Sequence, residues 1–208
     1  MNHELIKVCG MRDADNIRAV EALGVNWLGL IFWPRSSRYV AAPPAYLPTK
    51  AKRVGVFVDA DIDDIRSTAE TYSLDIIQLH GSETPEFVSQ LRSSCGDSIA
   101  IIKAFNIATS ADLEQTKCYE DIIDYFLFDT KGKSVGGNGE KFDWSVLAGY
   151  DGKTPFILSG GIGPDDAERV KTFSHPRCIG IDLNSRFESA PGLKDSILIK
   201  QFLDSLDN

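Results

Sequence analysis

Short segments typical of β-strands alternate with longer segments of helical period along this 208-residue chain, and this alternation constrains the fold more than any other feature. Strands are predicted over Leu5–Cys9, Trp27–Phe32, Arg53–Val58, Ile76–His80, Ile99–Phe105, Tyr125–Asp129, Phe156–Ser159 and Cys178–Leu183. Helices are predicted over Ala14–Leu23, Ile62–Tyr72, Pro85–Ser93, Ala108–Tyr119, Trp144–Ala148, Pro164–Phe173 and Lys194–Leu206. Pro85 and Pro164 suit a first helical turn, and the regions of Asp13, Asp61 and Asp165 suit helix N-caps or the positive end of the helix dipole.

Strands that are joined by helices must run parallel, because each connection has to cross back over the sheet. An open doubly wound sheet would normally show a Gly-x-Gly-x-x-Gly turn after its first strand, whereas Cys9-Gly10-Met11-Arg12 follows the first strand here. Eight units instead fit a small closed barrel. We therefore expect an α/β fold with one domain over residues 1–208, an eight-stranded parallel (β/α)8 TIM barrel. Pro43, Pro44 and Pro48 leave little room for a helix after the second strand.

Charge and composition narrow the range of partners. The chain has 22 Lys and Arg against 30 Asp and Glu, a formal net charge of −8, so its surface repels polyanions. We expect no nucleic-acid and no membrane partner, and the oligomeric state is not readable. No apolar run has the length of a signal peptide or a membrane span, which predicts a cytoplasmic protein.

The four cysteines, Cys9, Cys95, Cys118 and Cys178, are far apart in the sequence and form no Cys-x-x-Cys pair. They are predicted to be reduced thiols, with Cys95, Cys118 and Cys178 as buried packing residues.

Polar residues end several of the predicted strands, although the strand bodies are apolar. They are Cys9, Gln78 with His80, Asp129, Ser159 and Asp182. One such acid alone would suit an N-cap or a loop salt bridge. Because the C-terminal ends of all barrel strands meet at one rim, the set together predicts a shared pocket there.

Glycines and cations lie in the loops that follow these strands. Ser159-Gly160-Gly161-Ile162 comes after the seventh strand and Asn184-Ser185-Arg186 after the eighth, where barrels usually bind phosphate through backbone N–H groups. Gly136-Gly137-Asn138-Gly139 suits either a lid or a plain linker. The loop Phe32–Tyr39 carries Arg35 and Arg38, and an Arg fork binds carboxylates.

These residues together resemble the phosphoribosylanthranilate isomerase family of the tryptophan pathway over nearly the whole chain. The matching pieces are Lys7–Met11, Gly29–Phe32 with Ser36–Val40, Gln78–Gly81, Asp129–Lys131, Gly136–Gly139 with Phe142–Trp144, Ser159–Ile162, and Gly180–Ser185 with Pro191–Gly192 and Lys194–Asp195. No piece is specific alone, but the seven in this order are highly specific.

The resemblance implies an Amadori rearrangement of a phosphorylated aminoaldose, N-(5-phosphoribosyl)anthranilate, by general acid/base catalysis. It assigns the base to Cys9 and the acid to Asp129. Lys7 is expected to favour the Cys9 thiolate, and burial or a nearby carboxylate such as Asp182 to keep Asp129 protonated.

By the same resemblance, Arg38 binds the anthranilate carboxylate, and His80 and Asp182 line the pocket. Backbone groups around Gly160, Gly161, Asn184 and Ser185 are implied to bind the phosphate. No metal or organic cofactor is implied, and His3, His80 and His175 show no ligand spacing.

The chain departs from the family pattern at two positions. Ser37 replaces a frequent Pro, which should loosen the loop before Arg38. Arg186 replaces a common Gly, so the backbone there should avoid positive φ; its side chain either adds charge near the phosphate or points to water.

Other functions share parts of this pattern. The barrel isomerase of histidine synthesis performs the same rearrangement, but its family has Asp where this chain has Cys9. A sugar-phosphate epimerase or synthase, or a non-catalytic phosphate-binding barrel, would share only the phosphate site.

Overall fold

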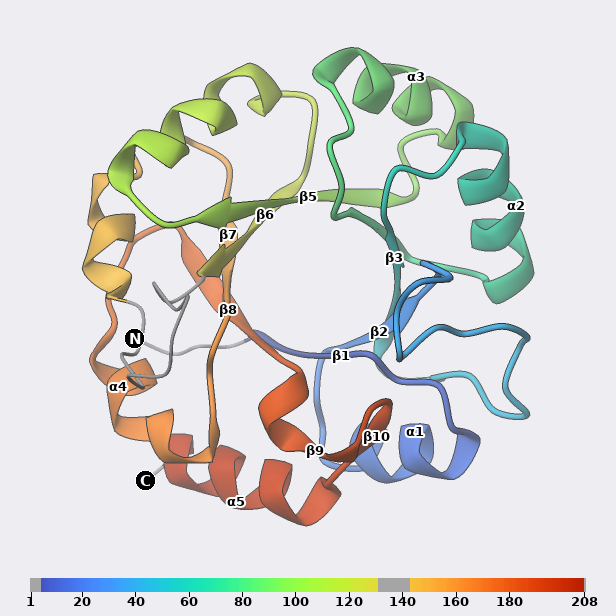
Figure 1. Cartoon of the computed structure of the whole chain (residues 1–208), viewed down its shortest axis with the longest axis vertical. Coiled ribbons are helices and arrows are strands. Elements are labelled where there is room, and N and C mark those ends of the chain that lie inside the picture. Colours follow the sequence, from blue (N-terminus) through green and yellow to red (C-terminus); the bar gives the residue numbers. More distant parts are fainter. Residues whose placement is uncertain (1–4, 131–142, 208) are drawn as a thin grey trace.

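Eight parallel strands close into a barrel in this computed structural model, which describes residues 5–130 and 143–207 (Figure 1). Neighbouring strands pair in sequence order, and β1 closes the ring by pairing with both β2 and β8. The strands are β1 (Leu5–Cys9), β2 (Trp27–Ile31), β3 (Lys52–Phe57), β4 (Ile76–Leu79), β5 (Ala100–Ile107), β6 (Tyr125–Thr130), β7 (Phe156–Ser159) and β8 (Cys178–Leu183). The predicted fold class and all eight strands are confirmed, to within two residues at each end.

Helices surround the barrel on the outside, as Figure 1 shows. They are α1 (Ala14–Glu21), α2 (Ile62–Tyr72), α3 (Pro85–Cys95), α4 (Ala167–Thr172) and α5 (Ser196–Asp207), with the 3-10 helices η1 (Ser110–Tyr119), η2 (Trp144–Gly149), η3 (Pro164–Asp166) and η4 (Ser185–Phe187). As the prolines predicted, no helix forms between β2 and β3.

Several local predictions need correction. The helix predicted from Lys194 begins at Ser196, because a short antiparallel hairpin, β9 (Glu188–Ala190) with β10 (Leu193–Lys194), precedes it. Three predicted helices are wholly or partly 3-10 helices. Asp13 caps α1 through Asn16 N as predicted, and Asp61 stands at the N-cap of α2 without a side-chain cap bond. In the Asp165 region, both Asp165 and Asp166 lie in the first turn of η3, as predicted, and Asp166 accepts the Gly163 N–H.

The inward and outward faces of the strands belong to two separate apolar layers. The inward layer consists of Cys9, Trp27, Val54, Val56, Ile76, Ile102, Ala104, Leu127 and Ile157. The larger outward layer packs the strands against the helices and includes the stacked rings of Phe126 and Phe128. This division follows from the alternation of side chains along each strand.

All four cysteines are free thiols, as predicted. Cys178 is buried as predicted, and Cys9 is buried too. The predicted burial is wrong for Cys95, which is half-buried, and for Cys118, which is exposed on η1. In the part of the chain that the structure describes, no helix is both long and apolar enough to cross a membrane.

Candidate active site

The polar strand ends occupy the last inward positions of four strands. Leu127 and Ile157 belong to the inward layer, so alternation turns Asp129 and Ser159, two residues later, to the same side. Asp129 and Ser159 are register partners across β6 and β7. Cys9 belongs to the inward layer at the end of β1, and Asp182 pairs with Lys7 across β8 and β1. The structure thus brings these groups to one rim of the barrel.

The Cys9 thiol is buried above an ion pair. Lys7, two residues earlier on β1, is fully buried and places its Nζ atom 2.8 Å from Oδ1 of Asp182. The Ser159 hydroxyl donates to the other oxygen of Asp182 at 3.1 Å. Asp182 therefore bridges β1 and β7 through its two oxygens.

Burial raises the pKa of the Cys9 thiol, and Asp182 raises it further, whereas Lys7 and Lys194 act to lower it. Lys7 thus acts in the predicted direction, but burial outweighs it, so the thiol is protonated at neutral pH. Burial also opposes the charge of Lys7, but Asp182 and Cys9 outweigh burial and hold the pKa of Lys7 above its usual value. The ammonium group is therefore a permanent cation beside the thiol.

Gly29 gives the thiol its space. It is the register partner of Cys9 on β2, and a Cβ at this position would lie 2.8 Å from Cys9 Sγ and 3.1 Å from Cys9 Cα. A side chain here would push the thiol or the strand aside, so Sγ can occupy its position only because residue 29 is glycine.

His80 and Asp129 face one another across the rim. His80 Nε2 lies 3.8 Å from Asp129 Oδ2, and the two side chains are 31% and 25% exposed. On its other side, His80 Nδ1 lies 2.9 Å from Nε2 of the buried Gln78. The Asp129 carboxyl thus faces an imidazole, while Asp182, its predicted neighbour, is paired with Lys7 and Ser159.

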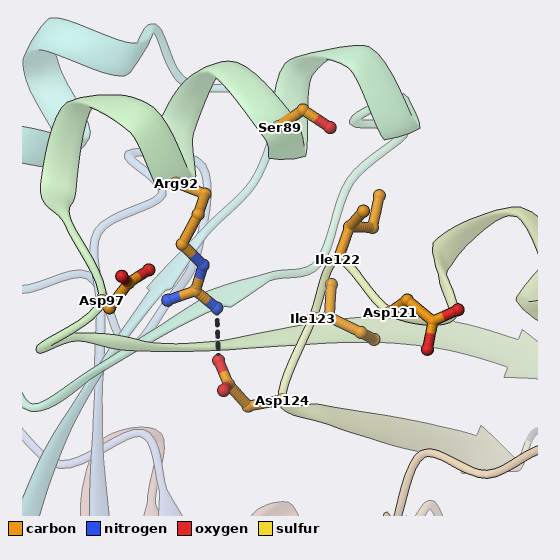
Figure 2. Close-up of a pocket in the computed structure, with 7 residues that line it drawn as sticks. All are labelled: Ser89, Arg92, Asp97, Asp121, Ile122, Ile123 and Asp124. Carbon is orange, nitrogen blue, oxygen red and sulfur yellow. Dashed lines mark hydrogen bonds and ion pairs between the residues drawn. The ribbon is translucent and has the colours of Figure 1, made fainter.

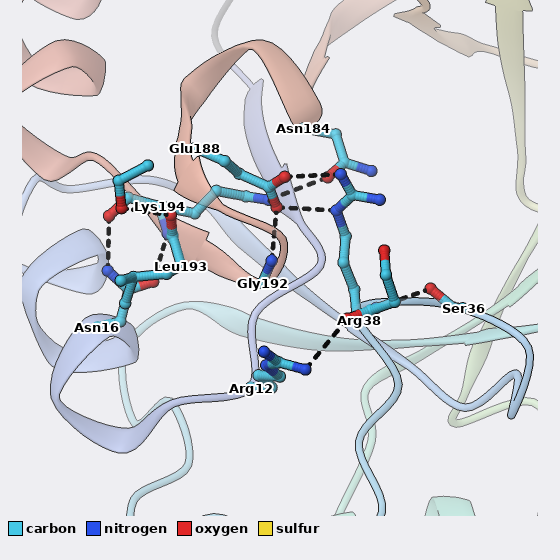
Figure 3. A network of polar contacts seen from close by, with 11 residues as sticks. Arg12, Asn16, Ser36, Arg38, Asn184, Glu188, Gly192, Leu193 and Lys194 are labelled. Atoms are coloured by element: carbon cyan, nitrogen blue, oxygen red, sulfur yellow. Dashed lines mark hydrogen bonds and ion pairs between the residues drawn. The ribbon is translucent and has the colours of Figure 1, made fainter.

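Arg38 reaches the site from the loop after β2 and is held by a residue that the sequence did not single out. Its Nε and Nη2 donate to the two oxygens of Glu188 at 2.8 and 2.6 Å (Figure 3). Lys194 Nζ donates to Glu188 and, at 2.9 Å, to Asn184 Oδ1. Lys194 was part of the family motif but had no predicted role. Glu188 gave no sequence signal, because it follows the last barrel strand in a segment predicted as loop.

The loop before Arg38 is tied down despite Ser37. The Ser37 carbonyl accepts from Arg12 Nη1 at 3.1 Å, and the Arg38 N–H donates to the Ser36 hydroxyl at 3.1 Å. These two bonds hold the loop that the Pro-to-Ser difference was expected to loosen.

The predicted phosphate-binding residues follow β7 and β8. Gly160 and Gly161 adopt φ of +90° and +68°, which favour glycine, and η4 begins at Ser185, directly after Asn184. Arg186 does not adopt a positive φ, as predicted, and it is exposed. A Cβ on Gly163 would lie 3.2 Å from Arg186 Cδ, so its side chain crosses toward the loop after β7. The predicted lid or linker Gly136–Gly139 lies outside the described residues.

Other hollows of the described surface differ in position. One of about 320 Å³, lined by His80, Lys103, Asn106 and Tyr119 among others, continues from the same rim. Another of about 380 Å³, shown in Figure 2, lies where β5 and β6 begin, at the opposite end. There Arg92 is already paired with Asp124 at 2.5 Å. Within residues 5–130 and 143–207, no three His, Cys, Asp or Glu side chains are grouped to hold a metal ion.

Comparison with known proteins gives one consistent family. A family model described as N-(5'phosphoribosyl)anthranilate (PRA) isomerase matches residues 6–205. N-(5'-phosphoribosyl)anthranilate isomerase from Parabacteroides distasonis is 50% identical over 97% of this chain and 93% of its own length. Its counterpart from Phocaeicola vulgatus is 47% identical over 97% of both chains.

Solved structures agree with the sequence comparison. Phosphoribosyl anthranilate isomerase from Thermotoga maritima matches with a TM-score of 0.83 and 31% identity over 98% of both chains. A structure of such an isomerase in complex with reduced 1-(o-carboxyphenylamino)-1-deoxyribulose 5-phosphate matches with a TM-score of 0.81 and 29% identity, again over 98% of both chains. The chain belongs to the N-(5'-phosphoribosyl)anthranilate isomerase family, the isomerases of tryptophan biosynthesis.

Proposed function

We propose that this chain rearranges N-(5'-phosphoribosyl)anthranilate with Cys9 as the general base and Asp129 as the general acid. The observation that carries this assignment is the placement of a buried thiol near two lysines at the inward end of β1, with Asp129 at the inward end of β6 on the same rim. A base and an acid at one rim can act on different atoms of one small sugar.

The reaction needs one proton delivered and one removed. Asp129 gives a proton to the ring oxygen as the C1–O bond breaks, and the anthranilate nitrogen supplies the electron pair that forms the Schiff base. Cys9, as thiolate, then takes the proton from C2, which gives an enolamine with a hydroxyl on C2. This enolamine gains a proton at C1 and loses the proton of its C2 hydroxyl, which gives the ketone. Because burial raises the pKa of Cys9, the thiol has to lose its proton before this step, and Lys7 and Lys194 stabilise the thiolate once it forms.

The rest of the rim carries groups that can bind the two ends of the substrate. Arg38 offers a guanidinium for the anthranilate carboxylate. The positive-φ turn of Gly160 and Gly161, with Asn184 and Ser185 at the start of η4, supplies backbone N–H groups for the phosphate. His80 and Asp182 line the space between these ends. The family match over residues 6–205 also supports one domain and a cytoplasmic enzyme of small-molecule biosynthesis.

The experiment follows the loss of anthranilate-type fluorescence when purified protein is mixed with N-(5'-phosphoribosyl)anthranilate. Cys9→Ala and Asp129→Asn should each lower kcat by about 100-fold or more, the usual contribution of a positioned base or acid. Matched controls are Cys178→Ala, a buried thiol on the outward face, and Asp97→Asn, an exposed acid at the opposite end of the barrel. Turnover within about tenfold of the parent in either site variant would remove that residue from its role.

A further inference from the structure

Glu188 binds Arg38 along one complete edge of its guanidinium. Nε and Nη2 donate to the two carboxylate oxygens at 2.8 and 2.6 Å, the side-on bidentate geometry shown in Figure 3. Within the described residues, Arg38 Nη1 makes no hydrogen bond to a side chain or carbonyl. One edge of the guanidinium is thus occupied from within the protein, and the Nη1 end is open.

The partner on that edge is a permanent anion. Burial works against its charge, but the bonds from Arg38, Lys194 and the Gly192 N–H outweigh burial and lower the pKa of Glu188 to about 2. The Glu188 side chain is only 5% exposed, so water competes little for these bonds. The carboxylate therefore stays charged and occupied over the working pH range.

Glu188 is itself held in place by a buried hydrogen-bond network. Lys194, whose side chain is fully buried, bonds Glu188 and Asn184. Its backbone exchanges two hydrogen bonds with the Asn16 side chain on α1, at 2.7 and 2.8 Å. The hairpin that carries Glu188 is thus tied to α1, and the Arg38 fork is not a loose surface pair.

Arg38 lies close to the Gly10 backbone and to a second cation. A Cβ on Gly10, the residue after Cys9, would lie 2.6 Å from Arg38 Cδ, so the arginine stem lies against the backbone beside the thiol. Lys194 and Arg38 are both cations, and Arg38 acts to lower the pKa of Lys194. Glu188 is what holds two repelling cations side by side.

We propose that Glu188 is a positioning residue for substrate recognition: by occupying the Nε–Nη2 edge of Arg38 and bonding Lys194, it turns the open Nη1 end toward the substrate carboxylate. This inference rests on the proposed role of Arg38 as the carboxylate-binding group. Without Glu188, the Arg38 side chain can adopt several rotamers, and substrate binding then has to order it. Ordering a long side chain on binding costs affinity, so a preset fork favours the carboxylated ligand.

The experiment compares two ligands by isothermal titration calorimetry. One is the reduced product, which carries the 2-carboxyphenylamino group; the other is the matching phenylamino compound without the carboxylate. The ratio of their dissociation constants measures the preference for the carboxylate. Glu188→Gln, and Glu188→Asp as a second variant that keeps the buried charge but shortens the reach, should each lower this preference about fivefold. Affinity for the carboxylate-free compound should stay unchanged in both.

Arg38→Met and the double variant Arg38→Met/Glu188→Gln complete the cycle. If Glu188 acts through Arg38, the double variant shows the same preference as Arg38→Met alone. An unchanged or larger preference in both Glu188 variants, or equal loss of affinity for the two ligands, overturns the positioning role. A preference that survives Arg38→Met instead overturns the proposed function of Arg38, whatever the Glu188 variants do.

Discussion

Lys7 and Asp182 form a buried ion pair at 2.8 Å that lies next to the proposed base. Lys7 lies two residues before Cys9 on the same inward face, and both members of the pair act on the thiol, in opposite directions. The larger of the two effects is that of Lys7, which lowers the pKa, while Asp182 raises it. Burial therefore has the largest effect on the pKa of Cys9, and the two members of this pair shift it by smaller amounts in opposite directions.

Replacing the two members of this pair should shift the pKa of Cys9 in opposite directions. Lys7→Met removes the cation that favours the thiolate, so the pKa rises further; Asp182→Asn removes the anion that opposes it, so the pKa falls. The measurement is the ultraviolet absorbance of the thiolate against pH, with the same variant carrying Cys9→Ala subtracted to remove the other thiols. Shifts of the same sign in both variants would contradict this assignment.

The free energy of unfolding should fall in acid, because the Glu188 carboxylate becomes protonated there. Its folded pKa of about 2 lies below its usual value of 4.5, so its contribution is complete above about pH 4.5 and is lost as pH falls toward 2. The shift corresponds to about 3 kcal/mol of unfolding free energy. In urea unfolding near pH 6, the free energy of unfolding of the parent should exceed that of Glu188→Gln by about 3 kcal/mol. This difference should shrink near pH 3. The control Glu70→Gln changes an exposed carboxyl and should show no such convergence.

The eight strands and the placement of Cys9, Asp129, Ser159 and Asp182 follow from local rules. Apolar runs of strand length mark each strand, and alternation with Leu127 or Ile157 fixes the face on which the following polar residue lies. The common rim follows because parallel strands all end on the same side. These parts of the site therefore need no knowledge of long-range contacts.

The bond between Arg38 and Glu188 could not be predicted in this way. The two residues are 150 positions apart and meet only because β8 closes the barrel beside β1 and the β9–β10 hairpin folds back over the rim. A two-residue strand such as β10 has too few positions for a period to appear. The net direction of the Cys9 pKa could not be predicted for a related reason, since burial depends on the whole packed interior.

Gly29 should resist any larger side chain. A Cβ there would come within 3.1 Å of the Cys9 backbone, so Gly29→Ala has to move either β1 or the thiol. Overpacking of this kind costs about 1–3 kcal/mol of stability, and a displaced base lowers kcat by up to about 100-fold. Thermal unfolding and the fluorescence assay measure the two effects. Gly149→Ala, where a Cβ would meet only ordinary contacts at 3.7 Å, is the control and should change neither.

Lys103 and Glu83 should prove to be the structural support of the loop that carries His80. Lys103 is buried on the outward face of β5, and its Nζ donates to Gly81 O at 2.8 Å and to Glu83 at 3.1 Å. Glu83 in turn accepts from the Gly81 N–H, so the residue after His80 is held on both sides.

Lys103→Met leaves the buried Glu83 charge without its cation, which should cost about 3–5 kcal/mol in urea unfolding. Adding Glu83→Gln removes that unpaired charge, so the double variant should be more stable than Lys103→Met alone. Both variants lose the Lys103 bond to the Gly81 carbonyl and should lower kcat/KM. Lys200→Met breaks an exposed pair with Asp204 on α5 and should change neither quantity. A Lys103→Met protein as stable and active as the parent would show that the pair has no role in holding this loop.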